Sequence, residues 1–139
     1  MTAIFADASY WIAILNAHDQ WHDQAHRAEA RLGASRLVTT EEVLAEILDG
    51  FSDWGIAWRH GITRFVDRIR SDPGVLVVHQ SHESFEGALH LYRNRLDKGY
   101  SLTDCRSFLV MREMGIDEAL TADRHFQQEG FTLLLTRGG

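Results

Sequence analysis

Short apolar runs alternate with longer amphipathic stretches along the whole chain. The apolar runs lie at Ala3–Ala6, Leu37–Val38, Val75–Val78, Ala119–Thr121 and Phe131–Leu135. Between these runs, apolar residues recur at helical spacing in six stretches, at about 9–13, 20–32, 40–52, 56–70, 82–96 and 102–114. Strand-like runs that alternate with helical segments are typical of an α/β sandwich with a mainly parallel sheet, and this is the fold class that we predict.

Short polar side chains mark three of the predicted helix starts. Thr39 followed by Glu42, and Ser101 followed by Asp104, have the spacing of a capping box, in which each side chain bonds the other residue's backbone N–H. Ser81 is placed to cap the helix after the third strand. The helix after Thr39 carries one apolar stripe at helical spacing, made of Val43, Leu44, Ile47, Leu48 and Phe51.

The composition is that of a globular protein. A chain of 139 residues suits one domain, and we expect a single domain over 1–139. Hydrophobic residues make up 45% and charged residues 24%, a balance that can support a buried core. Cys105 is the single cysteine, which excludes an internal disulfide and fits a reducing cytoplasm. The sequence has no secretory signal and no apolar stretch near the roughly 20 residues of a membrane span, so we expect a cytoplasmic protein without membrane contact.

The charge balance restricts how the protein could bind a polyanion. Lys and Arg total 14 against 20 Asp and Glu, for a net charge of −6, which argues against nucleic-acid binding by bulk charge. A polyanionic substrate would need a local basic patch or a bound cation. Thirteen of the 14 basic residues are arginines, whose planar fork suits bidentate phosphate contacts. A nucleotide bias of the source genome explains the arginine excess equally well.

Four carboxylates follow predicted strands or lie early in the helices after them. Asp7 ends the first strand, and Asp123 follows the fourth strand. Glu46 lies about two turns into the helix after the second strand, and Asp104 lies in the first turn of the helix opened by Ser101. Because parallel strands end at one common edge of a sheet, where ligands bind, these four side chains are predicted to converge there.

Each of the four acids also has a purely structural interpretation. Asp7 could cap the following helix, and Glu46 could be a solvated helix residue. Asp104 could serve only as half of a capping box, and Asp123 could cap the short turn at Arg124–Phe126. Taken singly, none of the acids decides between a structural and a chemical role.

Taken together, the four acids point to a divalent cation. Phe108 and Met111 share a helix face with Asp104, which places this carboxylate toward apolar groups, where an unpaired charge is costly. Two carboxylates 4 Å apart at an effective dielectric of 20 repel by about 4 kcal/mol, so protons or cations must offset such a cluster. Oxygen ligands without Cys or His select hard ions, Mg²⁺ or Mn²⁺. Those ions beside arginines suggest phosphodiester hydrolysis.

Four segments of the chain resemble the PIN-domain ribonucleases, and among them the VapC-type toxins of bacterial toxin–antitoxin pairs. The segments are FADASYWIAIL, TTEEVLAEIL, SLTDCRSFLVMREMGI and EALTADRHFQQEGF, and together they span almost the whole chain. The resemblance implies a PIN-like three-layer sandwich, an acidic metal site that holds Mg²⁺ or Mn²⁺, and cleavage of single-stranded RNA.

The resemblance also assigns roles to individual residues. The four acidic positions of the family fall on Asp7, Glu46, Asp104 and Asp123. Two supporting polar positions fall on Ser9 and Thr121. We expect Asp7, Asp104 and Asp123 to lie nearest the metal. Glu46 would bind through water or position the nucleophile. Ser9 stands where the family often has asparagine or threonine, which affects only its supporting role.

The resemblance further implies a toxin that a small cognate antitoxin inhibits, and a homodimer. The small size without an appended domain favours a toxin over a nuclease of RNA processing or decay. A non-catalytic PIN-like scaffold remains a further alternative. RNA phosphates could be guided by basic residues near the third and fourth acids, which could equally be solvated surface residues: Arg93, Arg95, Lys98 and Arg124.

Other features of the sequence favour different interpretations. A receiver domain needs an acidic pair after the first strand, and a haloacid-dehalogenase-type phosphatase needs Asp-x-Asp, whereas this chain has Asp7-Ala8-Ser9. His18, His22 and His26 recur every four residues and could hold Zn²⁺, or simply form a polar helix face. Trp54 and Trp58 lie one turn apart and would suit a partner-binding groove if exposed.

Overall fold

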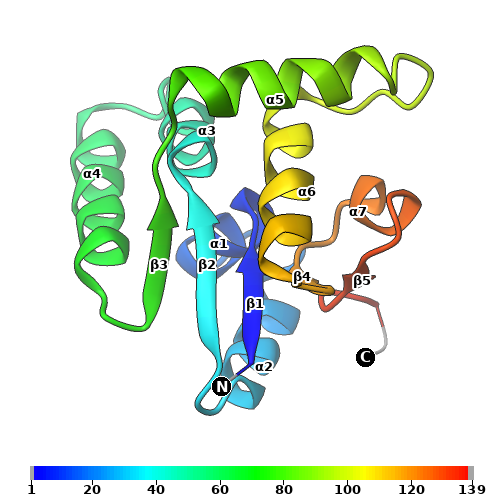
Figure 1. Cartoon of the computed structure of the whole chain (residues 1–139). Coiled ribbons are helices and arrows are strands. Elements are labelled where there is room, and N and C mark those ends of the chain that lie inside the picture. The colour runs from blue at the N-terminus through cyan, green and yellow to red at the C-terminus, as the bar shows by residue number, and fades with distance from the viewer. Residues whose placement is uncertain (1, 138–139) are drawn as a thin grey trace.

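The protein is built around one five-stranded sheet in which every neighbouring pair of strands is parallel. The structure is a computed structural model that describes residues 2–137. Its strands are β1 (Ala3–Ala6), β2 (Arg36–Thr40), β3 (Val75–Val78), β4 (Glu118–Leu120) and β5 (Thr132–Leu133). They lie side by side in the order β3-β2-β1-β4-β5 (Figure 1). The first strand of the chain is therefore the central strand of the sheet.

Helices cover both faces of the sheet and one of its ends. They are α1 (Ala8–Leu15), α2 (His22–Arg31), α3 (Glu41–Gly50), α4 (Ile56–Ser71), α5 (His82–Arg93), α6 (Leu102–Met114) and α7 (Arg124–Gln128). In Figure 1, α6 stands in front of the sheet, α1 and α2 lie behind it, and α5 crosses the end to which the strands point. The predicted three-layer α/β sandwich is confirmed. No helix within residues 2–137 is long and apolar enough to span a lipid bilayer.

The core lies between the central strand and α6. Phe5 on β1 is fully buried, because β2 and β4 flank it within the sheet and helices cover both faces. Phe108 on α6 and Phe126 on α7 are also fully buried, and their rings meet edge to face with centroids 4.9 Å apart. The ring centroid of Phe126 in turn lies 6.2 Å from that of Phe5. This aromatic column fixes α6 and α7 relative to the end of β1.

The helix starts follow the predictions with one correction. Ser81 and Ser101 form capping boxes with Ser84 and Asp104, as side chain and backbone exchange hydrogen bonds in both pairs. The predicted box at Thr39 and Glu42 is wrong, because β2 continues to Thr40, which itself caps α3 by accepting from Val43 N–H at 3.1 Å. Thr39 remains within the sheet and donates its hydroxyl to the carbonyl of Ala6 at 2.8 Å.

The apolar stripe of α3 is confirmed over most of its length. Val43, Leu44, Ile47 and Phe51 are buried, whereas Leu48 remains 37% exposed at the edge of the stripe. This packing fixes the rotation of α3 about its own axis. Glu46 is therefore directed away from the core, toward the end of the sheet where the strands terminate.

The order of the strands places a topological switch between β1 and β4. From β1 the chain proceeds to β2 and β3 on one side, and later to β4 and β5 on the other. Helices leave neighbouring strands in opposite directions at such a point, which opens a crevice at the carboxyl ends of the strands. Asp7 follows β1 directly, and Asp123 lies three residues after the end of β4. Two of the four predicted acids thus flank the switch point.

A buried carboxylate outside the crevice ties the last third of the chain together. Glu129, whose side chain is 5% exposed, accepts hydrogen bonds from Arg95 Nε at 2.8 Å, from Tyr100 Oη at 3.2 Å, and from Arg112. Burial alone would raise the pKa of Glu129, yet the bonds from Arg95 and Arg112 hold this pKa below its usual range. The network joins α6 to both the segment before it and the segment after α7.

Replacing Glu129 with glutamine is expected to lower the free energy of unfolding by about 2 kcal/mol. The variant keeps the size of the side chain but leaves two arginines without their anionic partner. The measurement is urea denaturation at pH 7, with Glu113→Gln as the matched control, because Glu113 is an exposed residue of the adjoining helix. Equal midpoints for the two variants would show that the network contributes nothing to stability.

Candidate active site

Asp7 is held at the end of β1 by the neighbouring strand. The pairing of Ala6 with Leu120 continues one residue further, so Asp7 lies beside Thr121. Thr121 Oγ1 donates to Asp7 Oδ2 at 2.9 Å, and Ser9 Oγ donates to the same oxygen at 3.4 Å. Asp7 is 5% exposed and forms no side-chain capping bond to α1. Asp7 occupies the N-cap position of α1, but without a side-chain capping bond, so capping does not account for its carboxylate.

Thr121 connects the first acid to the fourth. Its Oγ1 accepts from the backbone N–H of Asp123 at 3.1 Å while it donates to Asp7, and it lies 3.1 Å from Ser9 Oγ. Thr121 is fully buried, so water does not compete for these bonds. Ser9 and Thr121 thus both donate to Asp7, which is the contact that a supporting role in the site would need.

Replacing Thr121 with valine is expected to reduce cleavage of substrate about 10- to 100-fold, with little change in the melting temperature. Valine keeps the shape of the side chain but removes the hydroxyl that orients Asp7. The initial cleavage rate and the melting temperature are measured on the same preparation. Wild-type activity in the variant would assign Thr121 to packing alone.

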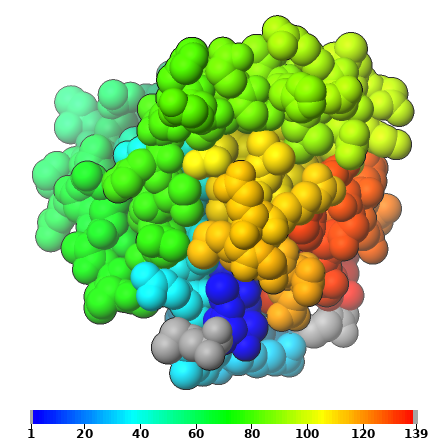
Figure 2. All heavy atoms as spheres, in the orientation of Figure 1, coloured from blue at the N-terminus to red at the C-terminus, as the bar shows by residue number. Residues whose placement is uncertain are grey.

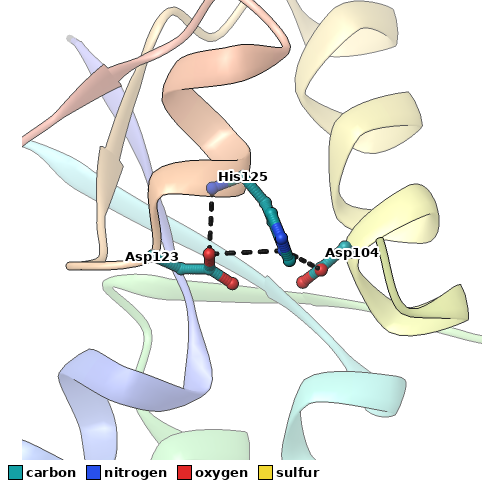
Figure 3. Close-up of side chains that lie close together, drawn as sticks. All are labelled: Asp104, Asp123 and His125. Carbon is teal, nitrogen blue, oxygen red and sulfur yellow. Dashed lines mark hydrogen bonds and ion pairs between the residues drawn. The ribbon is translucent and has the colours of Figure 1, made fainter. Parts of the chain in front are cut away.

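Asp104, Asp123 and His125 form the tightest cluster of potential metal ligands within the described residues. His125 Nδ1 lies 3.1 Å from Asp104 Oδ2 and 3.4 Å from Asp123 Oδ1, and Figure 3 shows the ring between the two carboxylates. One ligand atom from each residue falls within 4.8 Å of the others. The three residues come from the start of α6 and the start of α7.

Helix caps position both carboxylates of this cluster. Asp104 Oδ2 accepts from the backbone N–H of Ser101 at 3.1 Å, and Asp123 Oδ1 accepts from the backbone N–H of His125 at 2.9 Å. The structural interpretations of Asp104 and Asp123 as capping residues are thus correct, and they coexist with the cluster. Asp104 is itself buried at 8% exposure, as its position on a face shared with Phe108 and Met111 predicted, and both apolar residues are fully buried.

Glu46 completes the acidic group from the opposite side of the crevice. It lies on α3, exposed at the rim, and no hydrogen bond or ion pair is recorded for it among residues 2–137. Its pKa is raised, first by partial desolvation and then by the charges of Asp104 and Asp123. The structure therefore brings the four predicted acids to one place, with Glu46 as the most accessible member.

The electrostatics of the group show an uncompensated negative charge. Burial, followed by the charge of Glu46, raises the pKa of Asp7 to about 7. Burial also raises the pKa of Asp104, although the Ser101 N–H and His125 oppose this shift. A carboxylate that holds a proton near neutral pH, as Asp7 does, is suited to exchange it for a divalent cation. The donor set fits Mg²⁺ or Mn²⁺, and the imidazole of His125 is acceptable to Mn²⁺.

His125 is the member of the group that reasoning from sequence missed. The prediction was an all-oxygen set, whereas the structure places an imidazole 3.1 Å from Asp104. The available signal was its position two residues after Asp123, at the start of a helix that follows a strand. As the N-cap of α7, Asp123 accepts from the backbone N–H of His125, which fixes the backbone of His125 next to this carboxylate.

The four basic candidates differ in their surroundings. Arg124 is exposed and directly follows Asp123, so it lies beside the acids. Arg95 is bonded to Glu129, and Lys98 Nζ lies 3.7 Å from Asp97 Oδ2. Arg93 is exposed at the end of α5. Arg124 is thus the one of the four that adjoins an acid of the site in the sequence and has no ion pair within residues 2–137.

The three spaced histidines do not share one helix face. Helix α2 begins at His22, and His18 lies in the turn that precedes it. His22 Nδ1 lies 2.6 Å from the carbonyl of Ala13, and the rings of His22 and His26 meet edge to face. No group of three potential ligands includes these histidines in the part of the chain that the structure describes. The alternative of a zinc site on this helix receives no support.

The family of the chain follows from comparison with known proteins. The profile of the PIN domain matches residues 4–131, which include all four acids and His125. This chain belongs to the PIN-domain family. The match begins in β1 and ends just before β5, so it includes strands β2 to β4 and helices α1 to α7.

One relative, known from two bacterial strains, and two solved structures are similar to this chain. The 23S rRNA-specific endonuclease VapC20 of two Mycobacterium tuberculosis strains, CDC 1551 and H37Rv, is 33% identical over 134 residues, which cover 92% of this chain and 95% of VapC20. The crystal structure of M. tuberculosis VapC20, described as a sarcin–ricin loop cleaving toxin, superposes with a TM-score of 0.82 at 30% identity, covering 93% and 96% of the two chains.

PAE2754 from Pyrobaculum aerophilum superposes with a TM-score of 0.60 at 15% identity, over 96% of this chain and 90% of that one. At this identity the likeness concerns the fold alone. The superposition on VapC20 relates this PIN domain to VapC-type toxins.

Proposed function

We propose that this chain is a metal-dependent endoribonuclease that cleaves single-stranded RNA as the toxin of a type II toxin–antitoxin pair. It works as a single PIN-like domain over 1–139, in the cytoplasm. The convergence of four carboxylates at the switch point between β1 and β4 carries the proposal. The relation to VapC20, an RNA endonuclease by name, supports both the reaction and the toxin class.

The residues of the crevice divide into two groups by burial. Asp7 and Asp104 are buried and hydrogen-bonded, so they are suited to hold Mg²⁺ or Mn²⁺ together with Asp123. When bound, the ion supplies a positive centre for the phosphate and lowers the pKa of a coordinated water. Glu46 at the exposed rim has a raised pKa and is suited to orient an attacking water and accept its proton.

The net charge of −6 is compatible with an RNA substrate if the positive charge is local. A divalent cation would offset part of the negative charge of the four acids, and the exposed Arg124 directly follows Asp123 in the chain. Arg93, at the end of α5, and Lys98, in the segment after it, are further exposed basic residues that could contact RNA phosphates. RNA would thus be held by a few placed charges, because the surface as a whole repels phosphates.

The test is cleavage of a mixed pool of RNAs with Mg²⁺, with Mn²⁺ and with EDTA, for the wild type and for Asp104→Asn. We expect cleavage with either ion, and none with the chelator or in the variant. Cleavage that persists with both EDTA and Asp104→Asn would remove the metal-nuclease proposal. A small reading frame directly upstream of the gene separates a toxin from a nuclease of RNA processing or decay.

The cognate antitoxin and a second copy of the chain are the partners that we propose. An aromatic cluster at the turn between α3 and α4 supports a protein partner: Trp58 stacks on Phe51, and Trp54 packs edge-on against both rings. Trp54 is 48% exposed and the adjoining Ile56 is 88% exposed. Co-expression with the upstream reading frame, followed by light scattering, tests both partners, because a bound antitoxin and a dimer give different masses.

A further inference from the structure

A second hollow lies beside the acidic crevice, where α3, α5 and α6 meet. Its volume is about 400 Å³, within the range of small-ligand sites. The lining consists of Glu42 from α3, Gln80 from the segment before α5, Ser81, Ser84, Phe85 and Ala88 from the start of α5, and Leu102, Thr103 and Arg106 from α6. In the space-filling view, the green atoms of α5 lie across the yellow atoms of α6 on this side of the molecule (Figure 2).

One side of the hollow is apolar and includes an aromatic ring. Phe85, Ala88 and Leu102 contribute this side, and Phe85 keeps half of its surface in contact with solvent. An exposed phenylalanine at the mouth of a hollow offers a flat face to a planar ligand. The spacing of Phe85 and Ala88, three residues apart on α5, places both side chains on the helix face directed at α6.

The other side of the hollow carries a buried charge pair whose hydrogen bonds are incomplete. Arg106 is 7% exposed, and its Nε lies 3.3 Å from Glu42 Oε2 without the geometry of a hydrogen bond. Arg106 Nε and Glu42 Oε1 are both buried without a hydrogen-bond partner within residues 2–137. An unpaired buried donor and acceptor cost free energy, and a ligand with a matching acceptor and donor would recover it.

The hollow adjoins a depression that reaches one of the four acids, Glu46. Glu42, Gln80 and Thr103 also line a smaller depression of about 210 Å³, which contains Glu46. Thr103 directly precedes Asp104 in the first turn of α6. A chain of RNA with its phosphate at the acids would therefore have a neighbouring nucleotide at the mouth of the hollow.

We propose that this hollow binds one unpaired nucleobase of the RNA, next to the phosphate that is cut. The ring stacks on Phe85, and the edge of the base exchanges hydrogen bonds with Arg106 and Glu42. An unpaired base offers a flat face for stacking and both donors and acceptors on its edge, which is the combination that this site presents. The inference rests on the proposed RNA cleavage, and it adds a residue set that selects where the RNA is cut.

The test combines abasic substitution in the RNA with substitution of Phe85. Single-stranded oligonucleotides around one cleavage site, each with one abasic nucleotide, are titrated by fluorescence anisotropy against the Asp7→Asn protein with Mg²⁺. We expect one position to be sensitive, with affinity reduced about 10- to 100-fold. Adding Phe85→Ala should cause a similar loss on intact RNA and no further loss on the RNA that is abasic at that position.

Two further variants separate base recognition from general effects. Glu42→Gln keeps the size of the side chain and is expected to shift the preferred base at the sensitive position by about tenfold. Tyr92→Ala removes an aromatic residue of similar exposure from the same helix, outside the hollow, and is expected to bind every oligonucleotide as the parent protein does.

The outcomes distinguish the two proposals. Equal binding by Phe85→Ala and the parent protein would overturn the base site and leave a polypeptide as the occupant of the hollow. An absence of measurable RNA binding would overturn it as well. Position-dependent binding by a protein whose wild type cuts no RNA with Mg²⁺ or Mn²⁺ would retain the base site and reject the nuclease.

Discussion

Replacing Asp7 with asparagine is expected to abolish RNA cleavage and, at the same time, to make the metal-free protein more stable. The catalytic loss should be at least about a thousandfold, because several kcal/mol of transition-state stabilisation depend on the ion that Asp7 would help to hold. The gain in stability has a separate cause. Asp7 is 5% exposed and lies near Glu46 and Asp104, so its negative charge is costly without a cation.

The two effects are measured on one preparation, as the initial rate of cleavage with Mg²⁺ and the free energy of unfolding in EDTA at pH 8. Asp67→Asn is the matched control, because Asp67 lies on α4 with a side chain that is 73% exposed. The control should change neither quantity. Loss of both activity and stability in Asp7→Asn would show that Asp7 supports the fold, and it would remove Asp7 from the metal site.

The second large effect is a stability that falls as pH rises, in the absence of metal. The pKa of Asp7 is about 7 in the folded protein against an ordinary value of 3.8. Between these values the folded protein holds a proton that the unfolded chain has lost. Relative to alkaline pH, the proton on Asp7 stabilises the folded protein fully below about pH 4. This stabilisation is lost as pH rises through 7. Over this window it amounts to about 4 kcal/mol.

Urea denaturation at pH 5, 6, 7 and 8 in EDTA measures this trend, and the same series with Mg²⁺ tests its origin. Mg²⁺ should restore stability at pH 7 and 8, since the ion replaces the lost proton. Asp7→Asn should remove most of the slope. Glu129 has a lowered pKa, so its contribution to stability changes with pH in the opposite direction. This contribution is lost only at lower pH, where the carboxylate takes up a proton and its network breaks. A wild type as stable at pH 8 as at pH 5 in EDTA would contradict the buried charge.

Local patterns in the sequence predicted the parts of the fold that depend on local chemistry. Asp104 is the clearest case, because Ser101 three residues before it predicted a cap, and Phe108 four residues after it predicted burial. The capping threonine of α3 was misplaced by one residue, from Thr40 to Thr39. Both threonines could cap a helix, and only the hydrogen bond from Thr39 to Ala6, on another strand, decides between them.

Contacts between distant segments were outside the reach of the sequence. His125 meets Asp104 across 21 positions, and Glu129 meets Arg95 across 34. Such pairs depend on how α6 and α7 pack, which no short motif encodes. Glu46 shows the same limit, since its helix position alone predicts a solvated side chain. Its part in the site follows only from the sheet order that brings α3 opposite α6.

The central position of β1 has a consequence for how the protein is made. The first strand to leave the ribosome waits for its second neighbour until β4, more than a hundred residues later, has been synthesised. Until then Asp7 has no Thr121 beside it, and Asp123 and His125 do not yet exist. A nascent chain therefore carries no complete set of acids until β4 and the start of α7 have been synthesised.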